Sequence, residues 1–270
     1  MLSLVKVSLL QSLFLSSSSI HSWSPWVTWA GINFVLVLIS SLLCVYLAPV
    51  ASGSGIPQIK CFLNGIKIPK VIRIRTYIVK VVGIILAVVG GLAVGKEGPM
   101  VHAGAVIAAG ISQGQSISLG ISSTIFESFR NDHEKRDFVA AGAAAGVSAA
   151  FGAPVGGVLF ALEEAASFWN QALTWRLFFT TVISYMTLDF GKSAFKGDFG
   201  NLTANGLLNF GHFENATWSY YEIPIFALMG VFGGSLGAAW VAVNTRITII
   251  RTRLRPSKFV KALEATLIGL

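Results

Sequence analysis

The longest stretch of the chain without a lysine, arginine, aspartate or glutamate runs from Val7 to Ile59. A helix needs about 20 apolar residues to cross a bilayer, so this stretch accommodates at least one spanning helix. It continues far beyond the length of a secretory signal peptide, and no A-x-A-like cleavage site follows its start. Only 12% of all residues are charged, whereas a soluble domain carries about 25%. We therefore expect an all-α polytopic membrane protein.

Shorter uncharged runs follow, and glycine and proline interrupt several of them. They are Val81–Gly95, Gly98–Phe126, Phe138–Leu162, Leu177–Leu188 and Ile223–Thr245. Val81–Gly95 and Leu177–Leu188 fall short of the length that a spanning helix needs. We therefore predict broken, short and re-entrant helices. Irregular backbone at membrane depth is tolerated where protein or a watery cavity surrounds it, so these breaks indicate a site.

The cationic residues gather in two clusters that contain no acidic residue. The clusters are Lys60, Lys67, Lys70, Arg73, Arg75 and Lys80, and Arg246, Arg251, Arg253, Arg255, Lys258 and Lys261. The positive-inside rule places both clusters in the cytosol. Topology then explains the net charge of +8 without a nucleic-acid partner. Residues 189–222 fall on the far side, where Asn201 and Asn215 begin N-glycosylation sequons.

Three segments combine glycine with proline: Gly53-Ser54-Gly55-Ile56-Pro57, Gly95-Lys96-Glu97-Gly98-Pro99 and Gly152-Ala153-Pro154-Val155-Gly156-Gly157. Each predicts a helix start, because proline suits the first helical turn and glycine allows close approach. A helix start inside a membrane offers free N–H groups and the positive end of a dipole to a dehydrated anion. Several such ends that converge would form an anion site, to which the Ser54 hydroxyl could add a donor. The alternative is that the segments are kinks and turns filled by packing.

Glu97 lies between two uncharged runs, so helix geometry places it near membrane depth, where ionisable residues are costly and by default functional. A carboxylate beside an anion site can occupy the site when charged and swing away when protonated. Glu97 would then gate anions and carry protons. The alternative is an ion pair with Lys96 that stabilises a loop, although adjacent residues point apart on a helix. Farther on, Glu163 or Glu164 could relay protons between the cytosol and Glu97, or simply lie near water at a helix end.

Other chemistries find little support. Gly90, Gly95 and Lys96 match part of a nucleotide-binding loop, but Glu97 replaces the Ser/Thr that would hold magnesium. His102 has no ligand partner at helical spacing, so we expect no metal site. The two cysteines are interpreted as packing residues. An intramembrane enzyme that uses Glu97 and His102 lacks a nucleophile or metal triad. We expect neither an enzyme nor a bound cofactor.

The three Gly/Pro segments in this order, with Glu163-Glu164 closing the helix after the third, resemble the CLC family of chloride channels and chloride/proton exchangers. The resemblance runs from about Trp26 to Leu270, which leaves residues 1–25 as an atypical N-terminal segment. Two further segments, Lys60–Gly65 and Ser167–Gln171, are similar to the late-endosomal and lysosomal branch. The resemblance implies the first half of the CLC inverted-repeat fold over residues 26–270, without the second half or the CBS domains. The expectation is a truncated membrane domain.

The resemblance also implies roles for individual residues. Ser54 matches the central anion-coordinating serine, Glu97 the gating glutamate and Glu164 the internal proton glutamate of the exchangers. The implied chloride-binding set is Gly53, Ser54, Gly55, Ile56, Pro57, Gly95, Lys96, Gly98 and Pro99. The implied function is chloride transport across an organelle membrane by chloride/proton antiport. A passive voltage-gated channel, and a non-transporting subunit that assembles with full-length protein, are the alternatives.

Partners and location follow from the same resemblance. The family forms homodimers, with an interface that corresponds roughly to Phe151–Glu164 and Leu177–Phe190 of this chain. The lysosomal branch also pairs with a single-span glycosylated β-subunit. The resemblance therefore implies a homodimer with a possible β-subunit in the lysosomal or late-endosomal membrane.

Overall fold

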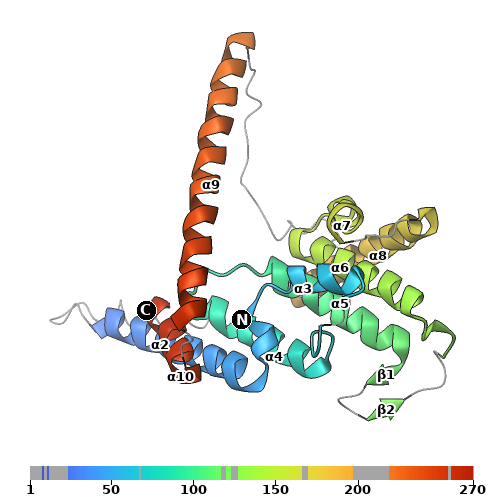
Figure 1. Ribbon diagram of the computed structural model, residues 1–270, viewed down its shortest axis with the longest axis horizontal. Helices are drawn as coiled ribbons and strands as arrows, with labels where there is room; N and C mark the ends of the chain where they lie inside the picture. Colours follow the sequence, from blue (N-terminus) through green and yellow to red (C-terminus); the bar gives the residue numbers. More distant parts are fainter. Residues whose placement is uncertain are drawn as a thin grey trace. The chain divides into compact units, whose positions relative to one another are not determined.

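The computed structural model describes residues 8, 11, 24–66, 68–116, 120–122, 127–165, 170–196, 219–254 and 257–269 (Figure 1). Helices form nearly all of its regular structure, which confirms the predicted all-α class. The chain divides into two compact units, one of Met1–Asn209 with Ala262–Leu270 and the other of Phe210–Lys261. Most of the predicted N-terminal segment lies outside the described residues, as do both sequon asparagines, Asn201 and Asn215.

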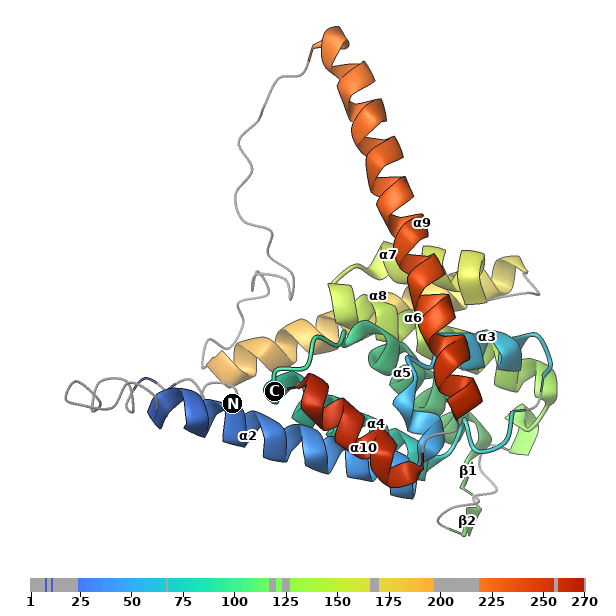
Figure 2. The same ribbon diagram turned by 60° about the vertical axis from the view of Figure 1, so that its left-hand side comes forward.

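The first unit begins with helix α2 (Ser24–Leu42), which continues into the π turn η1 (Leu43–Leu47) and the 3₁₀ turn η2 (Pro49–Ser52). The span Trp26–Leu47 is 22 residues long and apolar enough to cross a membrane, in agreement with the prediction for the first uncharged run. Helix α4 (Ile74–Val89) lies beside α2, as Figure 2 shows. The two helices are tied together where the Ser40 hydroxyl donates a hydrogen bond of 2.8 Å to the Gly83 carbonyl oxygen.

All three Gly/Pro segments begin a helix, as predicted. Helix α3 (Ile56–Leu63) follows the first, α5 (Glu97–Gln113) begins within the second, and α7 (Pro154–Phe160) begins within the third. At the start of α3, Gly55 has a φ of +93°, and a Cβ there would lie 2.6 Å from His102 Nδ1. Glycine is therefore required at position 55 by both the backbone conformation and the close approach of α5.

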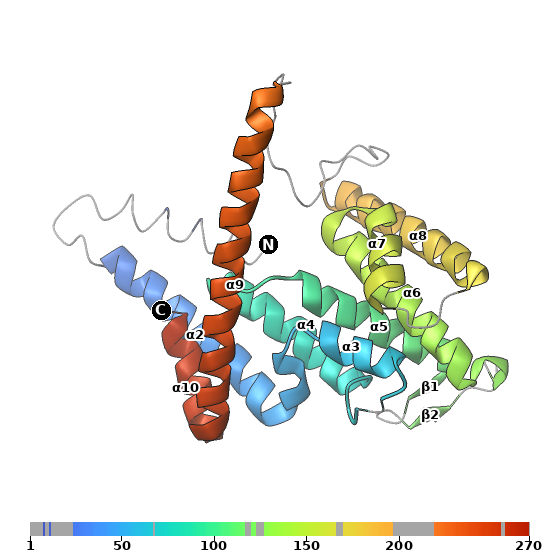
Figure 3. The same ribbon diagram turned by 45° about the horizontal axis from the view of Figure 1, so that its top comes forward.

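Helices α5 and α6 (Asp132–Phe151) form the closest contact of the unit and lie side by side in Figure 3. Glycine makes this approach possible, because a Cβ at Gly104 would lie 2.2 Å from the Gly142 carbonyl oxygen. A Cβ at Gly146 would lie 2.5 Å from the Met100 carbonyl oxygen. Small residues that bring backbones together are the usual means of packing helices in lipid. The buried core of the unit, including Ala105 and Ala143, lies along this contact.

Helix α8 (Gln171–Lys196) is much longer than its uncharged run, so the prediction of a short helix at Leu177–Leu188 is wrong. The helix continues through charged residues because several of them have partners. Arg176 contacts Glu134 and Asp137 of α6, and Lys192 Nζ lies 3.1 Å from Asp189 Oδ1 within α8. The α4 helix likewise starts before its uncharged run.

The remaining elements are short turns and the C-terminal helices. An antiparallel pair, β1 (Gln115–Ser116) and β2 (Ile121–Ser122), and the 3₁₀ turn η3 (Glu127–Phe129) precede α6, and the π turn η4 (Ala161–Ala165) extends α7. In the second unit, the 3₁₀ turn η5 (Tyr220–Glu222) leads into α9 (Ile223–Leu254), all of whose residues are exposed. The span Tyr220–Leu254 is also apolar enough to cross a membrane. Helix α10 (Lys258–Ile268) follows.

Candidate anion site

A cavity of about 410 Å³ lies within the first unit where the first two Gly/Pro segments meet. Its walls come from α2, η1, η2, α3, α4 and α5. The lining residues are Ser40, Cys44, Ala51, Ser52, Gly53, Ser54, Ile56, Lys80, Gly83, Ile84, Ala87, Val94, Gly95, Glu97, Gly98 and Pro99. The starts of α3 and α5 therefore converge on one space, as the prediction of an anion site requires. The third Gly/Pro segment does not line it.

Most of the predicted chloride-binding residues share this cavity. The members that line it are Gly53, Ser54, Ile56, Gly95, Gly98 and Pro99. The structure places the other three beside it: Gly55 forms the turn before α3, Pro57 lies in the first turn of α3, and Lys96 caps α5. No ion pair joins Lys96 to Glu97, both of which lie in the described part of the chain, so the loop-stabilising alternative finds no support.

The Ser54 side chain is held at the start of α3 with its hydroxyl proton unused. Its Oγ accepts a hydrogen bond of 3.3 Å from the Ile56 N–H. Ser54 makes no other hydrogen bond with the residues that the structure describes, so the O–H remains available to donate. The Gly98 backbone packs closely against Ser54, because a Cβ at position 98 would lie 2.7 Å from Ser54 Cβ. The close contact brings the first turn of α5 next to this hydroxyl.

Glu97 is the first residue of α5 and is half-buried in the cavity wall. Its carboxylate folds back over Gly95, where any side chain would collide with Glu97 Oε2. A negative charge is favourable at a helix N-terminus, where the dipole is positive. The carboxylate thus lies at the helix end that an external anion would also require.

Lys80 lines the cavity, although the sequence analysis did not include it in the predicted anion site. We predicted Lys80 as part of a cytosolic basic cluster, but the structure buries it in α4 with 4% exposure and in contact with the cavity. Its Nζ lies 2.7 Å from His102 Nδ1. Lys80 forms none of the ion pairs found among the described residues.

The hydrogen bonds of His102 show which atom is the donor in its contact with Lys80. His102 Nε2 lies 3.1 Å from the Val71 carbonyl oxygen, and a carbonyl oxygen can only accept, so Nε2 carries the proton. In neutral His102, Nδ1 is then an acceptor, and Lys80 donates to it. One of the three ammonium protons of Lys80 is used in this way.

The sequence contained a signal that identifies Lys80 as buried. The buried residues of α4 are Thr76, Val79, Lys80, Gly83 and Ala87. Their spacing of three or four residues marks one face of a helix. Lys80 lies on the same face as the small residue Gly83, which faces α2. The pairing with His102 had no such signal, since it joins two helices.

Glu164 lies away from the cavity, in the π turn after α7, and is exposed. It forms an ion pair with Lys60 of α3. Helix α3 therefore contributes to both predicted stations, with Ile56 at the cavity and Lys60 at Glu164. Glu163 is exposed beside it. No group of three or more potential metal ligands occurs in the described part of the chain.

Comparisons with known proteins agree with this geometry. Residues 36–270 match the protein family described as voltage gated chloride channel. The chain is 60% identical to the H(+)/Cl(-) exchange transporter 7 of Bos taurus, over 89% of this chain and 30% of that protein. It is 44% identical to chloride channel protein D of Dictyostelium discoideum, over 90% of this chain and 24% of that protein. The chain thus spans less than a third of the length of these relatives.

Solved structures share the fold. The crystal structure of a eukaryotic CLC transporter matches with a TM-score of 0.75 and 23% identity, over 99% of this chain and 43% of that one. The X-ray crystal structure of a slow cyanobacterial Cl-/H+ antiporter matches with a TM-score of 0.74 and 25% identity, over 99% of this chain and 56% of that one. Both TM-scores show that the described helices follow the CLC arrangement.

Proposed function

The chain belongs to the voltage gated chloride channel family, and on this premise we propose that it moves chloride across an organelle membrane in exchange for protons. The observation that carries the proposal is the cavity in which Ser54, Glu97 and Lys80 meet. The names of the relatives support antiport, since several are H(+)/Cl(-) exchange transporters. The printed names of these relatives are those of transporters and channels.

In this proposal, chloride binds between the starts of α3 and α5. The Ser54 hydroxyl and the N–H groups in the first turn of α5 donate to it, because such N–H groups have no acceptor within a helix. In α3 the Ile56 N–H is already bonded to Ser54 Oγ. The Lys80 ammonium supplies a positive charge. Binding and removal of the Glu97 carboxylate then gate the anion, since carboxylate and chloride require the same helix end.

Glu164 is the proposed second proton station. Its exposure gives water access to the carboxylate, and its ion-pair partner is Lys60 of α3. Protons would pass between Glu164 and Glu97 while chloride passes Ser54. Loss of Glu164 should then uncouple the two fluxes without closing the anion path.

The experiment that tests the proposal is reconstitution of the purified chain in liposomes. Chloride efflux and proton movement are measured together for the wild type, Glu97→Ala, Glu164→Ala and the matched control Glu163→Ala. We expect coupled flux in the wild type and the Glu163→Ala control. Glu164→Ala should retain chloride flux and lose proton movement, and Glu97→Ala should lose coupling as well. Absence of both fluxes from correctly inserted protein would refute autonomous exchange.

A passive channel is the second candidate, because relatives such as the Dictyostelium discoideum protein are named chloride channels. The same experiment distinguishes it. In a channel, wild-type protein moves chloride without protons, and Glu164→Ala leaves the chloride flux unchanged.

The third candidate is a non-transporting subunit that assembles with full-length protein. All residues of α9 are exposed within its unit, including large apolar ones such as Phe232 and Trp240. Such a surface requires lipid or protein contact. We propose a homodimer, with a single-span β-subunit as a further partner. Co-expression with a full-length relative, followed by pull-down and flux measurement, tests whether the chain suppresses transport.

We place the chain in the lysosomal or late-endosomal membrane. The support is the similarity of Lys60–Gly65 to that branch and the identity to exchange transporter 7. A fluorescently tagged chain should colocalise with an acidic-organelle dye. Accumulation at the plasma membrane would contradict this location.

A further inference from the structure

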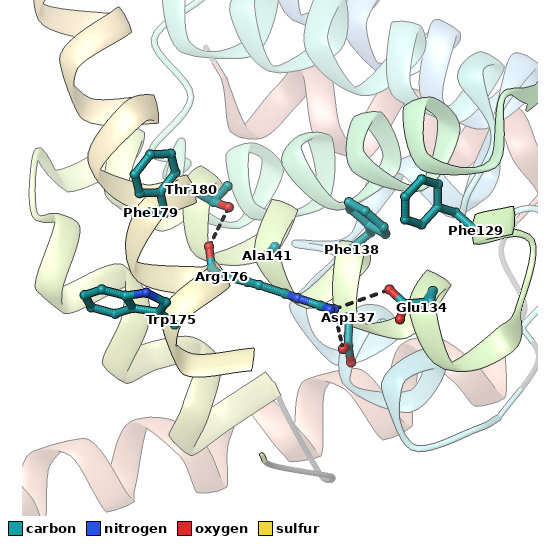
Figure 4. A pocket seen from close by; sticks show the side chains of 9 residues that line it. All are labelled: Phe129, Glu134, Asp137, Phe138, Ala141, Trp175, Arg176, Phe179 and Thr180. Carbon is teal, nitrogen blue, oxygen red and sulfur yellow. Dashed lines mark hydrogen bonds and ion pairs between the residues drawn. The ribbon is translucent and has the colours of Figure 1, made fainter. Parts of the chain in front are cut away.

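A second cavity, of about 540 Å³, lies where the first turns of α6 and α8 meet, and it shares no residue with the anion site. Figure 4 shows its lining. The Arg176 side chain crosses the cavity from α8 toward Glu134 and Asp137 of α6. Nothing in the proposed exchange mechanism uses these residues, so the cavity calls for a separate explanation.

The charges of this cavity do not cancel. Arg176 Nη1 lies 3.3 Å from Glu134 Oε2 and 3.4 Å from Asp137 Oδ2. Among the lining residues, two carboxylates therefore face one guanidinium, while His133 and Arg136 beside the cavity also act on Asp137. Both contacts use the same nitrogen, so the other guanidinium N–H groups form no hydrogen bond among the described residues. The cavity thus offers an excess carboxylate to a cation and free donors to an anion at the same time.

Aromatic rings surround these charges. Phe129 and Phe138 lie at one end with ring centroids 5.7 Å apart, edge to face. Trp175 and Phe179 line the other end, and Trp175 is 74% exposed. In Figure 4 the two pairs flank the Arg176 side chain. Aromatic faces combined with carboxylates are the chemistry that recognises quaternary ammonium groups.

The cavity also lies where both helices change from charged to uncharged sequence. Asp137 is the last charged residue of α6 before the run that starts at Phe138, and Arg176 is the last of α8 before the run that starts at Leu177. The contact between Asp137 and Arg176 places the two transitions at the same level. Such a level corresponds to the membrane interface, where tryptophan is enriched.

We propose that this cavity binds the headgroup of a choline phospholipid from the surrounding membrane. The quaternary ammonium would lie against Glu134, Asp137 and the rings of Phe129 and Phe138. The lipid phosphate would accept hydrogen bonds from the unused N–H groups of Arg176.

This zwitterionic ligand fits better than the two simpler ones. An anionic headgroup would use Arg176 but would meet two carboxylates. A small inorganic cation would use the carboxylates but would gain little from four aromatic side chains. A choline phospholipid satisfies both halves of the cavity. The inference is independent of chloride/proton exchange.

The test is a lipid titration of the purified full chain, delipidated in detergent and followed by native mass spectrometry. Dioleoyl phosphatidylcholine and dioleoyl phosphatidylglycerol are compared as probes. We expect the choline lipid to bind about fivefold more tightly than the glycerol lipid. The Glu134→Gln and Trp175→Leu variants should each weaken choline-lipid binding about fivefold. Glu127→Gln and Phe190→Leu are the matched controls, since both residues are exposed and neither lines the cavity.

The two variants keep the test decisive if one of them fails to fold, and the thermal midpoint of each is measured first. Equal or tighter binding of phosphatidylglycerol would overturn the proposal. So would choline-lipid binding that is unchanged in every folded variant. Weakened binding in Glu134→Gln or Trp175→Leu, with wild-type binding in both controls, would support it.

Discussion

Lys80 and Arg176 are cationic side chains that each line a cavity of the first unit, but the protein balances their charges differently. Lys80 is buried and donates to a neutral histidine, with no carboxylate to pair with it. Arg176 is half-exposed and faces two carboxylates. The cation of the first cavity therefore forms no ion pair with a described residue, although the Glu97 carboxylate lines the same cavity, and the cation of the second contacts two carboxylates.

This difference shows how local charge balance selects a ligand. A buried ionised group is costly without a partner, and an anion that enters the cavity can become that partner. A cation whose charge is already exceeded by carboxylates does not attract anions.

The largest expected effect comes from closing the anion cavity. Gly98→Ala places a Cβ 2.7 Å from Ser54 Cβ and 3.0 Å from the Ser54 carbonyl oxygen. The backbone oxygen cannot move without displacing the start of α3, so we expect a loss of about 3 kcal/mol of stability. Thermal unfolding in detergent measures it. Gly110→Ala on the same helix is the control, because nothing lies within 4 Å of its Cβ position. Equal midpoints for the two variants would contradict the prediction.

The next largest effect should come from removing the hydrogen bond between Lys80 and His102. His102→Leu deletes the acceptor for the Lys80 ammonium and the donor to the Val71 carbonyl oxygen, leaving two buried polar groups unsatisfied. We expect a loss of about 2 kcal/mol, read from the unfolding midpoint. The exposed His133→Leu serves as the control and should change little. A wild-type midpoint in His102→Leu would show that the contact contributes nothing.

Removal of the Lys80 charge tests its role directly. Lys80→Met keeps a similar length but loses the ammonium, so we expect chloride to bind about tenfold more weakly, or about 1.4 kcal/mol. Calorimetric titration with sodium chloride measures the affinity. Lys261→Met, an exposed position outside the cavity, should retain wild-type binding. Unchanged affinity in Lys80→Met would remove this residue from the proposed site.

The smallest effect should come from removing the charge of Arg176, which is already paired with carboxylates. Arg176→Gln breaks two contacts that are longer than 3.2 Å and partly exposed. Water screens such pairs, so we expect a loss of less than about 1 kcal/mol and no change in chloride affinity. The measurements are the same midpoint and titration. A fall in chloride affinity as large as that of Lys80→Met would abolish the distinction between the two cavities.

The sequence predicted the helix starts because their causes are local. Proline and glycine at the beginnings of α3 and α7, and glycine around Glu97, determine backbone conformation within a few residues. Several residues of the cavity could be predicted for the same reason, since Ser54, Glu97 and Gly98 belong to the same segments. The assignment of their roles in chloride and proton movement stays a prediction.

The sequence could not predict features that depend on distant pairs. Lys60 and Glu164 are 104 positions apart, and nothing in either segment identifies the other as its partner. The same holds for Lys80 with His102. Charges at the ends of the uncharged run misled the prediction of α8, because the partners of Arg176, Glu134 and Asp137, lie on another helix.

The glycine contact between α5 and α6 has a mechanical consequence. The two backbones touch at Gly104, Gly142 and Gly146, where not even a methyl group fits between them. Neither helix can slide along the other without collision, so α5 moves only if α6 moves with it. The start of α5 is thus held in place by α6, and in the proposed function the gating movement would fall to rotation of the Glu97 side chain about its own bonds.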